Sequence, residues 1–240
     1  MKKYIEMLRS DLRFEEGLHA CMNCGVCTAI CPAAEFYNYD PRLIINIIQN
    51  GDDESIEALL KSDTIWYCGQ CMSCRTRCPR SNTAGYVIQV LRQLSQETGL
   101  FAESEKGRQQ LVIKRVVGSN ILNYGYCLIP DTITPSLHPE QGPVWDWVFD
   151  NKDELYDQLG ANFKKPGEGV LREIDEETLY ELKKIFEITG SNKHFDNIEK
   201  FSKEKAEKMG LELDETTNCE YIKHIYCDNK EMHTRELSAS

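Results

Sequence analysis

Eight of the 11 cysteines fall into one motif that occurs twice. The first copy is Cys21-x2-Cys24-x2-Cys27-x3-Cys31-Pro32, and the second, 47 residues further on, is Cys68-x2-Cys71-x2-Cys74-x3-Cys78-Pro79. Three soft thiolates at two-residue intervals can wrap one face of an iron-sulfur cubane, and a fourth thiolate has to come from elsewhere. The sequence therefore predicts two [4Fe-4S] clusters.

The proline-flanked cysteine of each copy is expected to bind the other cluster, as in two-cluster ferredoxins. Cluster I is accordingly assigned to Cys21, Cys24, Cys27 and Cys78. Cluster II is assigned to Cys68, Cys71, Cys74 and Cys31. Crossing ligands hold two clusters close together, which a one-electron relay requires, so the motif favours electron conduction over catalysis.

Two other uses of cysteine fit the pattern less well. Zinc is satisfied by four ligands, so a third cysteine at the same interval followed by Cys-Pro is not typical of a zinc ribbon. Disulfides are disfavoured because the charged segment 1–9 has no apolar stretch typical of a signal peptide, and thiols stay reduced in proteins that are not exported.

Composition indicates a soluble globular chain. The 240 residues are 41% hydrophobic, and no apolar run approaches the about 20 residues that a spanning helix needs. The net charge of -11 lies mainly in residues 101–240, which carry 27 of the 39 acidic side chains. Such a charge disfavours nucleic acid and anionic membranes as partners.

Periodicity predicts an all-α protein. Helices are expected over residues 3–18, after the Asp40-Pro41 start, over 52–61, and after Ser81-Asn82-Thr83, with the cysteines on the loops and first turns between them. We expect an all-helical domain with two clusters at residues 1–118.

Residues 119–240 are expected to form a helical and irregular C-terminal extension. The stretch from Tyr124 through Pro143 reads as an extended linker or loop, and Trp145, Trp147 and Phe149 either anchor a partner or cover the protein's own core. Helical patterns follow over 175–189 and 191–209, and the last 30 residues are expected to be loose.

Several residues near the motifs have two interpretations. Gly25 and Gly69 either let backbone amides approach the cluster sulfurs or serve only in turns. The aromatic pair Trp66-Tyr67 is expected to shield a cluster from water rather than to take part in redox chemistry. Three basic side chains surround the second motif: Arg75, Arg77 and Arg80. They either raise the potential of its cluster, dock an acidic partner or form a solvated face.

The other three cysteines carry less information. Cys219, His224, Cys227 and His233 fit no zinc template, and independent thiols are the better interpretation. Cys127 is expected to pack as a small hydrophobe. No glycine-rich nucleotide loop and no adjacent Cys-Cys pair occurs in the sequence, so no catalytic site is evident in this chain.

The motifs resemble those of the C-type polypeptide of heterodisulfide reductase, over residues 15–100. The residues that carry the resemblance read Cys-Met-Asn-Cys-Gly-Val-Cys-Thr-Ala-Ile-Cys-Pro and Cys-Gly-Gln-Cys-Met-Ser-Cys-Arg-Thr-Arg-Cys-Pro. That resemblance implies an α-helical ferredoxin fold. It also implies a relay between a flavin-bearing A-type subunit and a catalytic B-type subunit with Cys-Cys-Gly motifs.

The segment from Tyr124 to Trp145 looks like the extended C-type subunit of heterodisulfide-reductase-like complexes in sulfur-oxidising prokaryotes. This second resemblance implies a cytoplasmic complex that oxidises sulfur carried on a lipoate-binding protein. Because the extension departs from the methanogen pattern, it is expected to be a partner-docking arm. Two alternatives remain: the iron-sulfur subunit of a quinone-linked dehydrogenase, and a zinc-stapled protein-interaction module.

Overall fold

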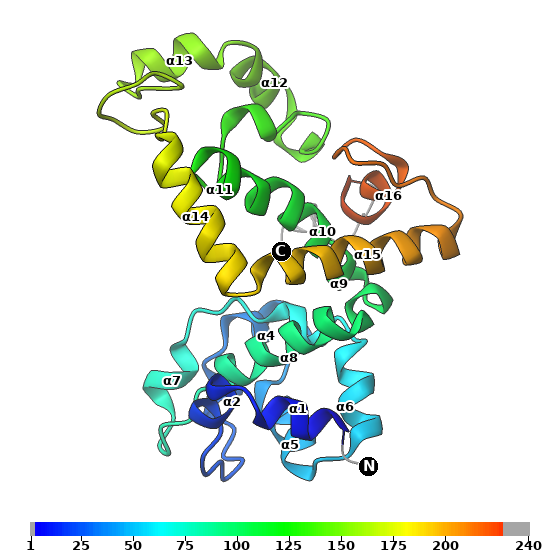
Figure 1. The fold of residues 1–240 in the computed structure, drawn as a ribbon. Coiled ribbons are helices and arrows are strands. Elements are labelled where there is room, and N and C mark those ends of the chain that lie inside the picture. The colour runs from blue at the N-terminus through cyan, green and yellow to red at the C-terminus, as the bar shows by residue number, and fades with distance from the viewer. Residues whose placement is uncertain (1–2, 228–240) are drawn as a thin grey trace, which may run out of the picture. The chain divides into compact units, whose positions relative to one another are not determined.

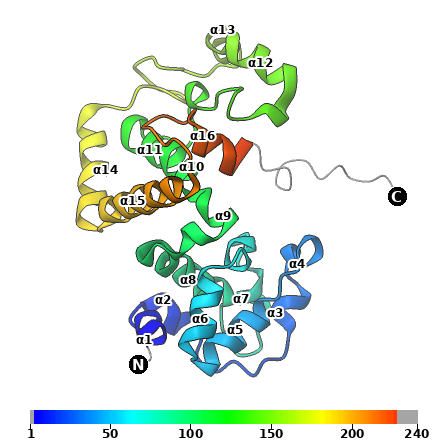
Figure 2. The ribbon, with the colours of Figure 1, turned by 90° about the vertical axis from the view of Figure 1, so that its right-hand side faces the viewer.

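The computed structural model describes residues 3–227, within which every regular element is a helix (Figures 1 and 2). The predicted all-α class is confirmed. The chain divides into two compact units, unit 1 (Met1–Arg108) and unit 2 (Gln109–Ser240). This division comes before the expected boundary at residue 118, because residues 109–118 are helical and pack within unit 2. None of the described helices combines the length and apolarity that crossing a membrane requires.

Unit 1 is a set of short helices around one long helix, α8. Its elements are α1 (Lys3–Arg9), α2 (Leu12–Gly17), α3 (Val26–Ala29), α4 (Pro32–Phe36), α5 (Pro41–Asn50), α6 (Asp53–Leu60), η1 (Thr64–Tyr67), α7 (Ser73–Arg77), α8 (Ala84–Thr98), η2 (Leu100–Glu103) and α9 (Glu105–Arg108). The helices predicted after Asp40-Pro41, over 52–61 and after Thr83 are confirmed as α5, α6 and α8. The predicted helix over 3–18 is interrupted at Asp11, whose side chain caps α2.

Helix α8 forms the centre of the unit 1 core. Its residues Val87, Ile88, Leu91 and Leu94 are buried, and they pack in one cluster with apolar side chains of α1, α5 and α6. Burying each such side chain is worth about 1.5–3 kcal/mol relative to leaving it in water. Five of the motif cysteines pack half-buried against this same cluster: Cys21, Cys27, Cys31, Cys68 and Cys74.

Carboxylate caps fix where the helices of unit 1 begin. Asp40 and Asp52 accept hydrogen bonds from the backbone N–H groups of Leu43 and Ser55, at 3.1 and 2.9 Å. Each cap satisfies a donor that the first turn of a helix leaves unpaired. Asp63 acts at long range, since it accepts from the Lys106 N–H at 2.9 Å and so holds the start of α9.

Unit 2 contains α10 (Gln110–Ile113), the π-helical segment η3 (Lys114–Gly118), α11 (Ser119–Tyr124), η4 (Pro130–Thr132), η5 (Pro139–Gln141), α12 (Gly142–Asp150), α13 (Lys152–Gln158), α14 (Glu176–Ile188), α15 (Ser191–Met209), α16 (Glu220–Ile222) and η6 (Lys223–Cys227). The helices predicted over 175–189 and 191–209 are confirmed as α14 and α15. They meet at a bend at Gly190, whose φ of 76° is left-handed (Figure 1).

The stretch from Tyr124 through Pro143 is irregular, as expected, apart from the short turns η4 and η5 and the start of α12. Side chains stabilise its turns: Asn120 donates to the hydroxyl of Thr132 at 2.7 Å, and the Trp145 indole donates to the Ile133 carbonyl at 2.9 Å. The expectation for the end of the chain is wrong. The segment 211–227 is packed rather than loose, because Tyr221 and Ile222 are fully buried. Residues 228–240 lie outside the described part of the chain.

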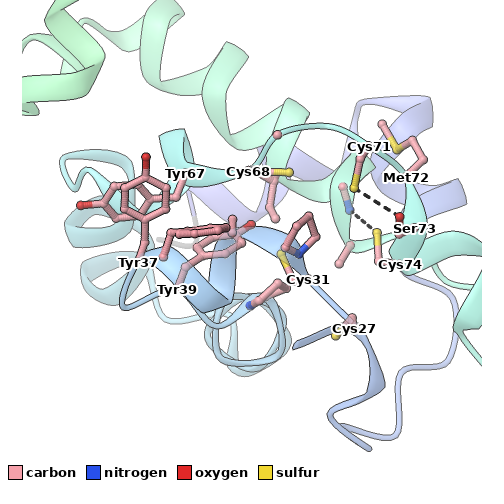
Figure 3. A pocket seen from close by; sticks show the side chains of 18 residues that line it. Cys27, Cys31, Tyr37, Tyr39, Tyr67, Cys68, Cys71, Met72, Ser73 and Cys74 are labelled. Carbon is pink, nitrogen blue, oxygen red and sulfur yellow. Dashed lines mark hydrogen bonds between the residues drawn. The ribbon is translucent and has the colours of Figure 1, made fainter. Parts of the chain in front are cut away.

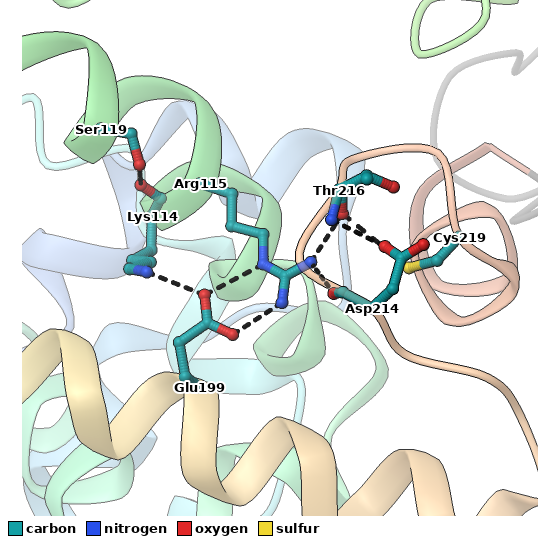
Figure 4. Close-up of polar contacts among 7 residues, drawn as sticks. All are labelled: Lys114, Arg115, Ser119, Glu199, Asp214, Thr216 and Cys219. Carbon is teal, nitrogen blue, oxygen red and sulfur yellow. Dashed lines mark hydrogen bonds and ion pairs between the residues drawn. The ribbon is translucent and has the colours of Figure 1, made fainter. Parts of the chain in front are cut away.

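An ionic network ties three segments of unit 2 together (Figure 4). Glu199 of α15 accepts hydrogen bonds from Lys114 at 2.8 Å and from the Arg115 guanidinium at 2.8 and 3.0 Å. Arg115 also donates to the carbonyls of Asp214 and Thr216, at 2.6 Å each. Burial alone would raise the pKa of Glu199, but the hydrogen bonds and charges of Arg115 and Lys114 hold it below its ordinary value.

We expect the variant Glu199→Gln to lower the unfolding free energy of the protein at pH 7 by about 1–3 kcal/mol, the usual loss for hydrogen bonds to charged groups. A carboxyl whose pKa is lowered by folding stabilises the folded protein at pH values above its ordinary pKa of 4.5. This stabilisation is lost as the pH falls through the pKa that the carboxyl has in the folded protein. In urea denaturation, the difference in unfolding free energy between wild type and variant should therefore shrink as the pH falls below 5. Glu207→Gln, on an exposed position of α15, is the control. A difference independent of pH would contradict the ionic origin.

Candidate functional site

The two cysteine motifs have matching backbones. Asn23 and Gln70, at equivalent positions, both have a left-handed φ of 54°. The next equivalent pair, Gly25 and Met72, have φ values of 84° and 58°. Left-handed backbone is uncommon for residues other than glycine and is concentrated at ligand-binding turns. Both copies therefore form the same strained turn, and the glycine expected to matter in the first copy corresponds to a methionine in the second.

These turns direct backbone amides at sulfur. The N–H of Asn23 donates to the Cys21 sulfur at 3.4 Å, and the N–H of Gln70 donates to the Cys68 sulfur at the same distance. Gly85, at the start of α8, donates its N–H to the Cys74 sulfur at 3.4 Å. Amide donors stabilise the negative charge of thiolates and of the clusters they bind. Gly69, in contrast, has no left-handed φ and no close neighbour that requires a glycine.

Short helices place the remaining motif cysteines. Cys27 lies in α3 and Cys74 in α7, and these two helices pack on each other. Cys31 immediately precedes α4, and Cys78 immediately follows α7. The cysteine before each proline therefore lies at the far end of a short helix from the first two cysteines of its own copy.

Two cavities collect all eight motif cysteines. The larger, of about 270 Å³, is lined by Cys31, Cys68 and Cys71 (Figure 3). The smaller, of about 30 Å³, is lined by Cys21, Cys24 and Cys78. Cys27 and Cys74 form part of both linings. Each proline-flanked cysteine thus lines the cavity that holds the first two cysteines of the other copy, which is the grouping that crossed ligation requires.

The cysteines differ in exposure and in acidity. Cys24 and Cys71 are exposed, and the other six are half-buried. Burial raises the pKa of Cys27 and of Cys74. A hydrogen bond with the Ser73 hydroxyl lowers the pKa of Cys71, the most solvent-accessible thiol of the larger cavity.

Tyrosines cover one side of the larger cavity. The rings of Tyr37 and Tyr67 stack at a centroid distance of 4.5 Å, and Tyr39 meets Tyr67 edge-on at 6.2 Å. The Lys106 ammonium lies over the stacked rings, 5.5 and 5.2 Å from their centroids. Tyr67 therefore occupies the shielding position that the sequence suggested, while Trp66 packs against the core of unit 1.

The structure adds site residues that the sequence did not indicate. Asn82, expected only to cap a helix, instead accepts the N–H of His19 at 2.7 Å, and its amide contacts the Cys78 sulfur at 3.8 Å. Tyr39 and Arg92 approach Cys68 from distant parts of unit 1. Residue spacing in the sequence does not indicate these contacts, because each joins segments that are far apart in the chain or belong to different elements.

Other candidates lie apart from the two cavities. Arg75, Arg77 and Arg80 are exposed, and Arg75 donates to the Tyr86 hydroxyl at 3.2 Å. Their docking role stays a prediction. Cys127 is exposed, so its expected packing is wrong.

Cys219 is buried, and Cys227 contacts the Ser136 carbonyl at 3.5 Å. Among residues 3–227, no three His, Cys, Asp or Glu side chains gather closely enough to hold a single metal ion. His233, which completed the possible ligand set with Cys219, His224 and Cys227, lies outside the described residues.

The helical fold and the two cysteine-lined cavities are typical of a ferredoxin-like iron-sulfur protein. Residues 17–82 match the 4Fe-4S dicluster domain family, which supports 4Fe-4S clusters as the cofactor. The C-type polypeptide of the ferredoxin:CoB-CoM heterodisulfide reductase of Methanosarcina acetivorans is 30% identical over 212 residues, 88% of this chain and 76% of that protein. The chain belongs to the family of C-type polypeptides of heterodisulfide reductase.

Other relatives match a shorter part. The C-type iron-sulfur polypeptide of the CoB–CoM heterodisulfide reductase of Methanopyrus kandleri is 33% identical over 105 residues, 42% of this chain and about half (53%) of that protein. A second Methanosarcina acetivorans protein, the C-type polypeptide of the ferredoxin/F420H2-dependent CoB-CoM heterodisulfide reductase, is 31% identical over 144 residues, 58% of this chain and 81% of its own length. The 212-residue alignment is longer than unit 1, so it extends well into unit 2. The expectation that the extension departs from the methanogen pattern therefore does not hold for this relative, whereas the alignment with the Methanopyrus kandleri protein covers only 42% of the chain.

In cluster-free, reduced protein at pH 7, we expect iodoacetamide to modify Cys71 faster than Cys74. Cys71 is exposed and its pKa is lowered, whereas burial raises the pKa of Cys74, and only the thiolate reacts. Peptide mass spectrometry gives the two rates. Exposed Cys127 is the control, since it should react both with and without clusters. Equal rates at Cys71 and Cys74 would contradict the described environments.

Proposed function

We propose that this chain binds two [4Fe-4S] clusters with crossed ligands. Cluster I would be held by Cys21, Cys24, Cys27 and Cys78. Cluster II would be held by Cys68, Cys71, Cys74 and Cys31. The observation that carries this proposal is the grouping of the cysteines in the two cavities, where each proline-flanked cysteine lines the cavity of the other copy.

The function we propose is that of an electron-relay subunit. When bound, each cluster supplies a site that accepts and releases one electron. Cys27 and Cys74 line both cavities and so keep the two sites adjacent, while exposed Cys24 and Cys71 give each site an edge toward solvent. The tyrosines and the apolar core cover the remaining sides. The chain thus provides two accessible ends joined by a protected centre, with no catalytic site of its own evident.

The names of the relatives support a place in a multisubunit complex. We propose that the partners are a flavin-bearing A-type subunit and a Cys-Cys-Gly B-type subunit, and that the complex works in the cytoplasm. The substrate is proposed to be sulfur undergoing oxidation, on the resemblance of residues 124–145. Because a methanogen relative aligns with most of this chain, assays of the complex should compare oxidation of lipoate-bound sulfur with reduction of a heterodisulfide.

Unit 2 is proposed to be the docking arm. On α12, Trp147 and Val144 expose 58% and 72% of their surface, whereas Trp145 of the same helix is half-buried and hydrogen-bonded. Exposed tryptophan is typical of residues that anchor a partner. Of the three aromatics considered from the sequence, Trp147 is therefore the best candidate for such an anchor.

Crossed ligation is tested by two matched variants, Cys78→Ser and Cys31→Ser. Cys78→Ser should damage cluster I and leave cluster II intact, whereas Cys31→Ser should do the reverse, because each serine removes a ligand from the cluster of the opposite motif. EPR of the reduced proteins, compared with Cys24→Ser and Cys71→Ser as references for loss of clusters I and II, identifies the damaged cluster. If Cys78→Ser resembles Cys71→Ser, ligation is not crossed.

A further inference from the structure

A half-buried cation lies beside the larger cysteine cavity. The Arg92 guanidinium of α8 donates to the carbonyl of Cys68 at 2.6 Å and to that of Ile65 at 2.7 Å. Its charged end lies over the Trp66 ring, 5.4 Å from the centroid. Among residues 3–227, no carboxylate forms an ion pair with Arg92. Its positive charge is therefore held at a proposed cluster ligand without a compensating anion of the protein.

The electrostatic partner of Arg92 is the cysteine itself. The Arg92 guanidinium donates to the Cys68 carbonyl at 2.6 Å, which places the positive charge next to the residue whose thiolate would bind cluster II. An arginine remains protonated in proteins even when partly buried. Taking a charge partly out of water costs free energy that pairing offsets, so the anionic thiolate and the group it would bind are the natural counter-charge for this guanidinium.

A buried hydroxyl points to the same sulfur. Tyr39 is 3% exposed, and among the described residues its hydroxyl has no hydrogen-bond partner of normal geometry. Figure 3 shows its hydroxyl directed toward the end of the cavity where Cys31 and Cys68 lie. A phenol hydroxyl carries its proton at neutral pH, so this buried group is available as a hydrogen-bond donor. It is an unused donor aimed at the sulfurs of cluster II.

The smaller cavity has no equivalent pair. The arginine in its lining is Arg42, whose side chain is 50% exposed and pairs with Asp40 at 3.5 Å. Solvent and the carboxylate both weaken its field at the cavity. The two proposed cluster sites therefore differ in electrostatic environment although their motifs are equivalent.

We propose that Arg92 and Tyr39 raise the reduction potential of cluster II above that of cluster I, so that a single electron on this subunit resides at cluster II. This inference rests on the proposed two-cluster function. Reduction adds one electron, supplied by the partner oxidoreductase subunit, and no bond of this chain is made or broken. A nearby cation and a hydroxyl donor stabilise the added negative charge, which raises the potential.

The test is a potentiometric titration of anaerobically purified full-length protein, followed by EPR. The wild type should show two one-electron steps. Arg92→Gln and Tyr39→Phe should each move the higher step to lower potential and leave the lower step in place. Arg92→Lys, which keeps the charge but loses the planar fork, should produce a smaller shift than Arg92→Gln.

The controls are Arg42→Gln, beside the smaller cavity, and Tyr37→Phe, at the same tyrosine stack. Both should leave the higher step unchanged. Unchanged steps in Arg92→Gln and Tyr39→Phe, or a shift confined to the lower step, would overturn the inference and leave two-cluster binding standing. If Arg92→Gln does not assemble clusters, Tyr39→Phe and Arg92→Lys decide the question. A wild type in which both clusters titrate in one step would also overturn the inference, whereas about four iron atoms per chain in place of about eight would contradict the two-cluster proposal itself.

Discussion

The packing of α8 within unit 1 holds both cysteine motifs in position. Buried Val87 and Leu91 anchor this helix in the core, and its contacts reach α1, α2, α5, α6 and α7. The same helix supplies the Gly85 amide to the Cys74 sulfur and the Arg92 guanidinium to the Cys68 carbonyl. Since the cysteines themselves lie on short turns that cannot be stable alone, the geometry of the site depends on this one packed helix.

Equivalent motifs are placed in unequal surroundings. The left-handed turns and the amide contacts to sulfur repeat between the copies, so the local backbone is set by the motif. What differs comes from side chains outside the motifs, since Arg92 and Tyr39 lie at one cavity and Asn82 and Arg42 lie at the other. A repeated motif can therefore provide two sites of similar shape, while the rest of the fold makes them electrically distinct.

The sequence predicted those features of the fold and site that depend on neighbouring residues in the chain. Spacing identified the eight cysteines, and the Asp40 and Asp52 caps with helical periodicity identified α5 and α6. It missed what tertiary contacts determine. Asn82, Tyr39 and Arg92 act through partners in other elements, and the packing of 211–227 depends on Tyr221 and Ile222 finding apolar neighbours within unit 2. The left-handed φ of Met72 could have been inferred only from its equivalence to Gly25 in the repeat.

The central claim is that this one chain holds two [4Fe-4S] clusters. The most direct measurement is the content of iron and acid-labile sulfide per chain in anaerobically purified protein, with EPR of the dithionite-reduced sample. Two cubanes require about eight of each, and two adjacent reduced clusters should give spin-coupled signals. About four of each, or zinc in place of iron, would contradict the account.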